Sequence, residues 1–596
     1  MFNQEPRSAK VKLSANHRIA LWYGVLLFIF AIFTVRLFYL QIIKHDYYRA
    51  AALNDQLKQY SIPAQRGTIS ARSESGTIPI VLNQRLYTLY ADPSLVRDPD
   101  ASAAKVAAIT HGDKNRYAEL MKTTGSRYQV LVKRLSQNQK DQVKNLHLSG
   151  VGWQAVDYRI YPQGSLAANL LGFVNDDGQG KYGIEQALDK QLAGKPGELK
   201  AITDVNGVPL AASRDNVQID PKAGDNVVLT IDVALQKRLE DSLKQWLQRV
   251  RSQSGSVVII DPNNGAVKAM ASWPTYNPAE YYKVSDANNF NNLAVSTPIE
   301  VGSIMKPLTT AAALSFNAIK PDTTFYDPGQ WQLDGRTITD VEEVRGAGTR
   351  SIGDVLNHSL NTGATWMLMQ MGGKTGEVTK LARQRWHNYL VNHYLFGKPT
   401  GIEQGYEAAG FVPDPNKGYA LQLAYANTSF GQAMTATPLQ MAAALSSIIN
   451  GGTYYQPHLI YQTTDAMGNV KNKKPVVLRQ HVISSKTSEQ IKSLMEYVIS
   501  EHYRSGFTYL NFPDNYIVGG KTGTAQIANP AGGYYNDRYN GTYTGFVGGD
   551  KPQYVVSIEV NQPHVAGYAG TSAGQAMFAD IAHTLIDDFN VAPKSR

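Results

Sequence analysis

Two residues one helical turn apart could generate a nucleophile. The segment Gly302-Ser303-Ile304-Met305-Lys306 precedes an alanine-rich run, so the Ser303 hydroxyl and the Lys306 amine should share one face of a helix. A serine attacks a carbonyl only when a nearby base takes its proton, and a neutral lysine is such a base. Burial and a second positive charge lower the pKa of a lysine enough for this role. Alone, the Ser-x-x-Lys pattern also fits an ordinary solvated turn.

Two further motifs follow in the chain, and each is weak by itself. Ser359-Leu360-Asn361 offers a hydroxyl and an amide, although these residues also suit a helix cap. Lys521-Thr522-Gly523-Thr524 follows a strand-like segment, so Lys521 is predicted on a strand edge where Gly523 lets a substrate backbone approach closely. A phosphate-binding loop is excluded here, because Asn515 stands where that loop needs glycine.

A second Lys-Thr-Gly triplet, Lys374-Thr375-Gly376, competes for the role of the third motif. It comes after the helical-looking segment 365–371 and runs into charged residues, which is typical of a helix end followed by an exposed turn. We therefore place the third motif at Lys521. His358, which stands beside Ser359, is interpreted as structural rather than catalytic.

Composition excludes several kinds of chemistry. The chain has 596 residues, 43% of them hydrophobic and 18% charged, which indicates a globular protein with more than one folded unit. It contains no Cys, so a thiol nucleophile, a disulfide and a Cys-ligated metal are excluded. The 12 His show no His-Glu-x-x-His spacing, and we expect neither a metal nor a cofactor. The net charge of +9 is spread without basic runs, so no nucleic-acid partner is predicted.

An apolar segment near the N-terminus predicts a membrane anchor. Residues 19–43 contain a single charge, Arg36, and are long enough to cross a bilayer as a tilted helix. The preceding residues 1–18 hold four basic side chains and one acid, which places the N-terminus in the cytoplasm and the rest of the chain outside. A cleavable signal peptide is the alternative, but residues 33–38 lack the small side chains of a cleavage site.

The rest of the chain divides into two regions with different sequence patterns. Residues 45–224 mix short strands and turns with one predicted helical stretch at 101–146, and a turn cluster at 221–225 closes this region. Beyond it, hairpins are predicted at 256–271 and 543–560, with helices between and after them. This order predicts an α/β or α+β enzyme core in which helices cover an antiparallel sheet.

In their order along the chain, Ser-x-x-Lys, Ser-x-Asn and Lys-Thr-Gly form the joint signature of penicillin-binding proteins and serine β-lactamases. The chain resembles the class B, monofunctional penicillin-binding proteins, and most closely their cell-division (septal) type, from the anchor to about residue 588. It departs from the family at Val301, where proline is usual, and at 71–76, where the family has Asp-Arg-Asn-Gly. Further matching segments are 62–69, 87–93, 159–162, 171–174, 180–185, 430–440 and 450–452.

The resemblance implies a domain plan and a location in the plasma (inner) membrane. A cytoplasmic segment 1–18 and a transmembrane anchor 19–43 would precede a pedestal at 44–224, an elongated mixed α/β domain of the dimerisation type. A transpeptidase domain at 225–588 and a tail at 589–596 would follow. Expected partners are stem peptides ending in D-Ala-D-Ala, β-lactams, the membrane, a membrane-embedded glycan polymerase and divisome proteins.

The resemblance also implies a role for each motif residue, in a reaction that needs no cofactor or metal. Ser303 would attack the penultimate D-Ala of a stem peptide, and an amine of a neighbouring peptide would then take the acyl group. The implied roles are base for Lys306, proton relay for Ser359, substrate amide binding for Asn361, carboxylate binding for Lys521 and Thr522, close substrate approach at Gly523, and an oxyanion hole from the N–H groups of Ser303 and Thr524.

Several alternatives share parts of this pattern. An elongation-type class B transpeptidase differs only in its cellular role. A β-lactamase is about half as long, and most carboxypeptidases lack an anchored pedestal. A bifunctional synthase needs a glycosyltransferase domain that residues 45–224 do not match. A β-lactam sensor would have several membrane spans, and a scaffold protein would have lost Ser303 or Lys521.

Overall fold

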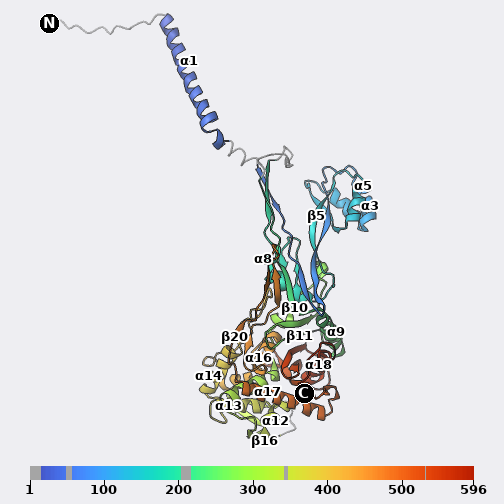
Figure 1. The fold of residues 1–596 in the computed structure, drawn as a ribbon, viewed down its shortest axis with the longest axis vertical. Helices are drawn as coiled ribbons and strands as arrows, with labels where there is room; N and C mark the ends of the chain where they lie inside the picture. Colours follow the sequence, from blue (N-terminus) through green and yellow to red (C-terminus); the bar gives the residue numbers. More distant parts are fainter. Residues whose placement is uncertain (1–14, 49–56, 203–216, 341–345, 530–531, 596) are drawn as a thin grey trace, which may run out of the picture. The chain divides into compact units, whose positions relative to one another are not determined.

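The computed structural model describes residues 15–48, 57–202, 217–340, 346–529 and 532–595 (Figure 1). Contacts between residues divide the chain into two compact units. The first unit comprises residues 1–64 and 195–222, and the second comprises 65–194 and 223–596. This division places parts of the predicted pedestal, residues 44–224, in both units. The single domain boundary at residue 224 stays a prediction.

The first unit contains the predicted anchor. Helix α1 (Ala15–Phe38) continues into the π-helix η1 (Tyr39–Ile43). Within them, Ile19–Ile43 is a 25-residue helix with a mean hydropathy of 2.2 and no buried part, long and apolar enough to cross a membrane. The basic residues expected to orient it lie mostly in 1–14, outside the described residues. The same unit holds an antiparallel sheet of β1 (Leu57–Ile62), β8 (Gly197–Ile202) and β9 (Val217–Ile219).

In the second unit, a seven-stranded sheet joins the pedestal region to much later residues. Strand β10 (Asn226–Asp232) pairs in parallel with β2 (Ile69–Ser73) and antiparallel with β18 (Ile460–Thr464). The remaining strands are β19 (Val470–Asn472), β3 (Gly76–Ala91), β4 (Gln129–Leu135) and β5 (Val151–Ile160).

The single helical stretch predicted at 101–146 is wrong. The structure has helices α3 (Pro99–Thr110), α4 (Lys114–Met121) and α5 (Gln137–Asn145), with strand β4 before α5. The side chains of Asp98, Asp113 and Ser136 each cap the start of a new helix. Strand β4 forms because pairing with β3 buries its Leu131 and Leu135, a tertiary contact that overrides local helical preference.

A five-stranded antiparallel sheet forms the centre of the later region. Its spatial order is β12 (Val267–Trp273), β11 (Ser254–Ile260), β23 (Pro552–Asn561), β22 (Tyr534–Gly548) and β21 (Ile517–Ala528). Both predicted hairpins are present, as β11–β12 and β22–β23. Strand β21, which carries the Lys-Thr-Gly motif, lies at an edge of this sheet.

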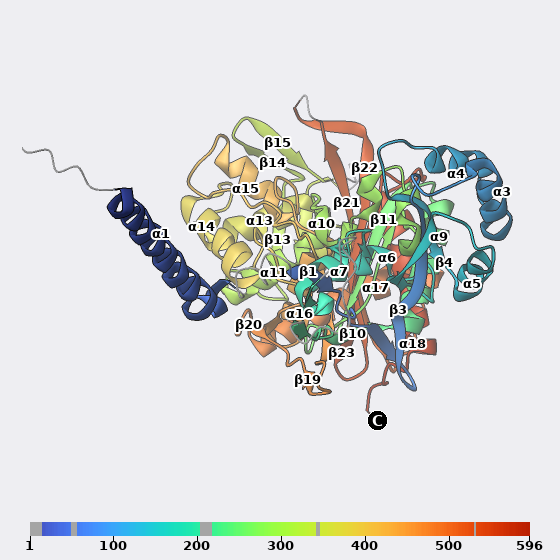
Figure 2. The same ribbon diagram turned by 90° about the horizontal axis from the view of Figure 1, so that it is seen from above.

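Alternate side chains of these strands enter two hydrophobic clusters. Val257 and Ile259 lie in one cluster with α9 (Val233–Arg249) and α18 (Ala576–Asp588). Val258 and Ile260 lie in the other, with α11 (Lys306–Ser315), α16 (Pro438–Ile449) and α17 (Ser485–Arg504). The predicted antiparallel sheet flanked by helices is therefore confirmed (Figures 1 and 2).

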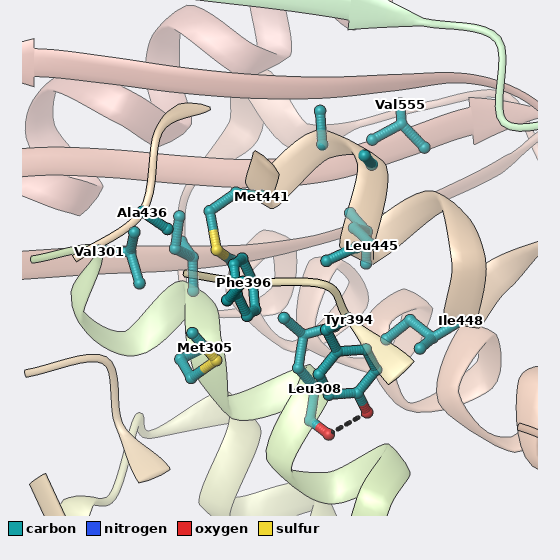
Figure 3. Close-up of a cluster of buried hydrophobic side chains, with 14 of the residues drawn as sticks. Val301, Met305, Leu308, Tyr394, Phe396, Ala436, Met441, Leu445, Ile448 and Val555 are labelled. Atoms are coloured by element: carbon teal, nitrogen blue, oxygen red, sulfur yellow. Dashed lines mark hydrogen bonds between the residues drawn. The ribbon is translucent and has the colours of Figure 1, made fainter. Parts of the chain in front are cut away.

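The second cluster fixes the helix that begins near Ser303. Figure 3 shows Met305 and Leu308 in one buried cluster with Met441 and Leu445 of α16 and with the rings of Tyr394 and Phe396. The Tyr394 hydroxyl donates a hydrogen bond of 2.7 Å to the Leu308 carbonyl oxygen. Burial of such side chains contributes about 1.5–3 kcal/mol each, which holds this helix in place.

Candidate active site

Ser303 lies at the start of a buried helix. The 3-10 turn η4 (Gly302–Met305) leads into α11, and this puts Lys306 Nζ 3.0 Å from Ser303 Oγ. Gly302 has φ +66° and donates a 3.0 Å hydrogen bond to the Gly431 carbonyl oxygen, which fixes the turn. Ser303 is 8% exposed and Lys306 is fully buried. The proposed nucleophile thus reaches solvent while its neighbouring amine does not.

Ser359 occupies a strained position after α12 (Ile352–Asn357). Its φ of +55° and the 3.0 Å bond from Leu360 N to the Val355 carbonyl oxygen form a Schellman ending, in which this position usually holds glycine. The left-handed conformation costs about 1–2 kcal/mol in a residue with a Cβ. It places Ser359 Oγ 3.2 Å from Lys306 Nζ and 3.0 Å from Lys521 Nζ.

Asn361 begins α13 (Asn361–Met371) and touches the same amine. Its Oδ1 lies 2.9 Å from Lys306 Nζ, while its Nδ2 donates a 3.1 Å bond to the Thr339 carbonyl oxygen. This second bond fixes the orientation of the amide group, so that an oxygen faces Lys306.

Lys521 reaches the site from the sheet edge. Its side chain is 1% exposed, and its Nζ lies 3.0 Å from the Thr522 carbonyl oxygen as well as from Ser359 Oγ. Lys374 is different, because its side chain is 64% exposed and pairs with Glu377 in a turn after α13. The structure therefore brings Lys521, and not Lys374, to Ser359 beside Lys306.

Burial and the neighbouring Lys521 change the protonation of Lys306. The pKa of Lys306 is lowered well below its usual value, first by burial and then by the positive charge of Lys521, while Asp340 acts in the opposite direction. Without its extra proton, Lys306 has two N–H groups and one lone pair. The Ser359 carbonyl oxygen and Asn361 Oδ1 can only accept, so they take both N–H groups. The lone pair is then left for a hydroxyl proton, such as that of Ser303.

The residues that follow Lys521 lie on the same strand, β21. A Cβ added to Gly302 would lie 3.1 Å from the Thr524 carbonyl oxygen, so the backbone of Thr524 runs beside the Ser303 turn. Thr522 is 9% exposed, and Thr524 Oγ1 accepts a 3.0 Å bond from Gly570 N. A Cβ on Gly523 would lie 2.2 Å from Thr542 Oγ1, so packing inside the protein already requires this glycine.

Asp340 makes an acidic contact near the site that was not predicted from the sequence. Asp340 accepts a 3.0 Å bond from Thr362 N at the start of α13, and its Oδ2 lies 2.8 Å from Thr362 Oγ1. No local pattern marks Asp340, because its partner lies in a different element. Among the described residues, no group of three or more His, Asp or Glu side chains is arranged to hold a metal ion.

Two family models match the chain. The model described as "Penicillin binding protein transpeptidase domain" matches residues 255–583, which include all three motifs. The model described as "Penicillin-binding Protein dimerisation domain" matches residues 61–229.

Individual proteins are similar over almost the whole chain. Stage V sporulation protein D of Bacillus subtilis is 28% identical over 595 residues, which are 99% of this chain and 88% of that protein. Peptidoglycan D,D-transpeptidase FtsI of Escherichia coli K12 is 26% identical over 585 residues, 97% of this chain and 92% of its own. The crystal structure of penicillin-binding protein 3 from Mycobacterium tuberculosis with aztreonam has a TM-score of 0.67 at 25% identity, and the match covers 90% of this chain and 98% of that one.

Proposed function

The chain belongs to the family of penicillin-binding protein transpeptidases, and on this premise we propose that it is a serine D,D-transpeptidase that cross-links peptidoglycan stem peptides. The observation that supports this function best is the set of hydrogen-bonding distances joining Ser303, Lys306, Ser359 and Lys521. A hydroxyl beside a buried amine whose pKa is lowered is an activated nucleophile.

Acylation begins when Lys306 takes the Ser303 proton. Ser303 Oγ bonds to the carbonyl carbon of the penultimate D-Ala, and the oxyanion that forms lies at the N–H groups of Ser303 and Thr524. Removing one such donor typically costs about 3 kcal/mol in the transition state. The proton then passes from Lys306 through Ser359 to the leaving nitrogen, and the peptide bond breaks to release D-Ala. Ser359 Oγ suits this relay because it lies within reach of both lysines.

The acyl group then passes to an amine. A neighbouring stem peptide attacks the ester carbonyl, Ser303 regains its proton, and a new peptide bond cross-links two strands. A β-lactam follows only the first half of this route, because its opened ring stays attached in place of a leaving group. The relative crystallised with aztreonam supports β-lactam recognition at this site.

Substrate binding uses the edge of the sheet. Lys521 and Thr522 hold the terminal carboxylate, Asn361 contacts the substrate amide, and β21 offers backbone groups along its free side at Gly523 and Thr524. Because Gly523 is already required by Thr542, its role toward substrate is secondary.

Cell division, with a membrane-embedded glycan polymerase and divisome partners, is our proposed setting, since FtsI is among the similar proteins. The same proposal includes a transpeptidase domain at 225–588 that faces outward and an uncleaved anchor with its N-terminus in the cytoplasm. A C-terminal reporter that is active only after export should then be active, whereas an N-terminus beginning beyond residue 43 in the isolated protein would show that the anchor is removed.

The intact mass of the purified protein after penicillin treatment tests the activity. We expect a stable gain of one drug molecule, carried by the peptide containing Ser303 and absent from Ser303→Ala. Rapid drug hydrolysis without an adduct would indicate a β-lactamase instead.

A further inference from the structure

Glu300 lies three residues before Ser303 and has no part in the proposed reaction. Its Oε1 accepts a 2.9 Å hydrogen bond from Ala433 N and a 3.0 Å hydrogen bond from the Tyr534 hydroxyl. Its other carboxylate oxygen, Oε2, is buried and has no hydrogen-bond partner within the part of the chain that the structure describes. Burial also raises the pKa of this carboxyl group. A buried oxygen without a partner costs free energy, so stability alone does not explain this side chain.

The backbone on both sides of Glu300 is fastened to the segment 431–436. Hydrogen bonds of 3.0 Å run in both directions between Ile299 and Ala436, and another of 3.0 Å runs from Gly302 N to the Gly431 carbonyl oxygen. The contact between the Glu300 carboxylate and Ala433 N lies between them. The turn that carries the nucleophile is therefore held against this segment from its beginning to its end.

The Tyr534 contact joins the same turn to the edge of the central sheet. Tyr534 is the first residue of β22, which pairs with β21 along that edge. Further along β22, Thr542 Oγ1 donates a 2.8 Å hydrogen bond to the Val301 carbonyl oxygen. Two side chains of β22 thus hold Glu300 and Val301. Because β22 also carries β21, these contacts set the distance between Ser303 and strand β21.

We propose that Glu300 is a positioning residue for the oxyanion hole, which the N–H groups of Ser303 and Thr524 form. Such donors must lie about 2.7–3.1 Å from the oxyanion, so a small change in the spacing of the two backbones weakens the hole. Glu300 acts through its bonds to Ala433 and Tyr534 and does not touch the substrate. This inference rests on the proposed function, since it assumes that these two N–H groups bind the oxyanion.

The kinetics of acylation by a penicillin separate binding from reaction. Stopped-flow measurements over a range of drug concentrations give a dissociation constant and a first-order acylation rate constant. Glu300→Ala should lower the rate constant about tenfold, less than the loss of a whole donor would, because the oxyanion forms only in the transition state. The dissociation constant should stay within about twofold. Tyr534→Phe should lower the rate constant about threefold, and the double variant should be no slower than Glu300→Ala, since both changes break the same link.

The infrared spectrum of the acyl-enzyme reports on the oxyanion hole itself. Hydrogen bonds from the hole weaken the ester C=O bond and lower its stretching frequency, and a penicillin labelled with carbon-13 at the lactam carbonyl identifies this band. Glu300→Ala should move the band to higher wavenumber. Glu300→Gln is the conservative variant, because its amide oxygen can still accept both hydrogen bonds, and it should restore the rate constant and the band. A purely structural role would leave the band in place.

Tyr535→Phe is the matched control, because it removes a hydroxyl from the next residue of the same strand, where side chains alternate between the two faces. It should change neither the rate constant nor the band. If Glu300→Ala does not melt cooperatively, Tyr534→Phe decides the question by the same two measurements. A normal rate constant with an unshifted band in the folded variants would overturn the positioning role but not the transpeptidase. Failure of the unaltered protein to form an acyl-enzyme would overturn the proposed function, and the role of Glu300 with it.

Discussion

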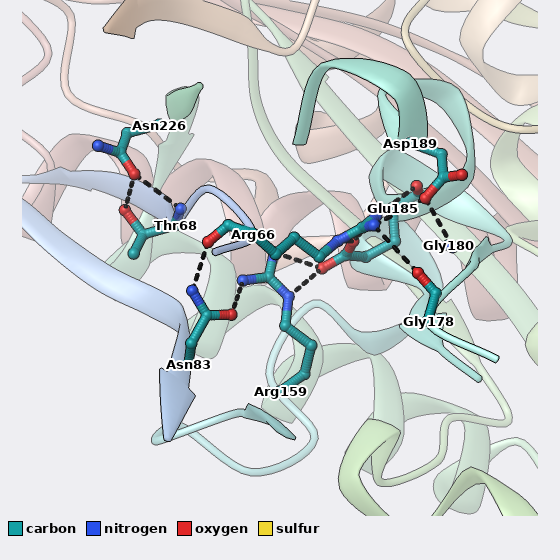
Figure 4. A network of polar contacts seen from close by, with 9 residues as sticks. All are labelled: Arg66, Thr68, Asn83, Arg159, Gly178, Gly180, Glu185, Asp189 and Asn226. Carbon is teal, nitrogen blue, oxygen red and sulfur yellow. Dashed lines mark hydrogen bonds and ion pairs between the residues drawn. The ribbon is translucent and has the colours of Figure 1, made fainter. Parts of the chain in front are cut away.

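The second unit contains two clusters of buried charged side chains, which differ in the charges that they bring together. In the arginine–glutamate cluster, the fully buried Glu185 lies between two guanidinium groups (Figure 4). Arg66 Nη2 lies 2.5 Å and Arg159 Nη2 lies 2.7 Å from its two carboxylate oxygens. In the catalytic cluster, Lys306 and Lys521 share the neutral hydroxyl of Ser359.

The difference shows how surroundings decide what a buried charge does. The first cluster compensates its charge and joins segments of the pedestal region, since Asn83 also accepts a 2.8 Å bond from Arg159. The second cluster places one positive charge beside another, and this lowers the pKa of Lys306. A carboxylate between two guanidinium groups holds structure in place, whereas two neighbouring lysines change the pKa of one of them and so its reactivity.

The largest effect on stability is expected when the carboxylate between the two guanidinium groups is removed. Glu185→Ala removes the carboxylate that Arg159 and Arg66 share and leaves Arg66 with Asp189, and it should lower the free energy of unfolding by about 3–5 kcal/mol. Chemical denaturation measures this loss. Asp157→Ala is the control, because it breaks only an exposed ion pair with Arg85 and should barely change stability. Equal losses in the two variants would contradict the structural role of the cluster.

The next effect follows from removing the positive charge beside Lys306. Lys521→Ala should slow acylation by a fluorescent penicillin about 100-fold, because a carboxylate contact is lost and Lys306 holds its proton more firmly. Lys374→Ala, in its exposed turn, should acylate nearly normally. If Lys374→Ala were the impaired variant, the third motif would be misplaced.

The same variant has a signature in its pH profile. Acylation needs neutral Lys306, so its rate rises with pH through the pKa of this amine. Removing Lys521 raises that pKa, and the rising limb should therefore move to higher pH. A lower plateau with an unmoved limb would mean that Lys521 binds substrate without acting on Lys306.

Glu559 is a third buried titratable residue, and it belongs to neither cluster. It is fully buried, its Oε2 lies 3.2 Å from Ser256 Oγ, and burial raises its pKa to about 7. The native state therefore binds a proton more tightly than the unfolded chain, and stability falls as pH rises from about 4.5 to 7. Glu559→Gln should be more stable than the unaltered protein at pH 8, by about 3 kcal/mol, but not at pH 4. Melting curves at both values check this, and a gain of equal size at pH 4 would rule out titration as its cause.

The smallest effect concerns the strain at Ser359. Ser359→Gly relieves the left-handed conformation and should raise the free energy of unfolding by about 1 kcal/mol, while acylation falls with the lost hydroxyl. Ser359→Ala loses the same hydroxyl but keeps the strain, so it should lose activity without the gain in stability. Denaturation of both variants separates the effect of the strain from that of the hydroxyl. A gain in stability in Ser359→Ala equal to that in Ser359→Gly would contradict this account.

The features that could be predicted from the sequence depend on local interactions. The apolar run at 19–43, the two hairpins and the turn from Ser303 to Lys306 depend on residues within a few positions of each other, so their spacing predicts them. The order of the three motifs was sufficient to indicate the family. The prediction of a helix through 129–135 is wrong because a non-local contact decides this segment: pairing with β3 makes it a strand.

The contacts within the site could not be predicted, because they form between distant segments of the chain. Only the folded chain brings Ser359 Oγ between Lys306 and Lys521, places Asp340 at the start of α13, and packs Gly523 against Thr542. It also gathers Arg66, Arg159 and Glu185 into one cluster. The partners in each case come from different elements, and the pKa of a buried group depends on how far water is excluded and which charges lie nearby. Those quantities exist only after the elements have packed, because a distance between segments is not a property of either segment.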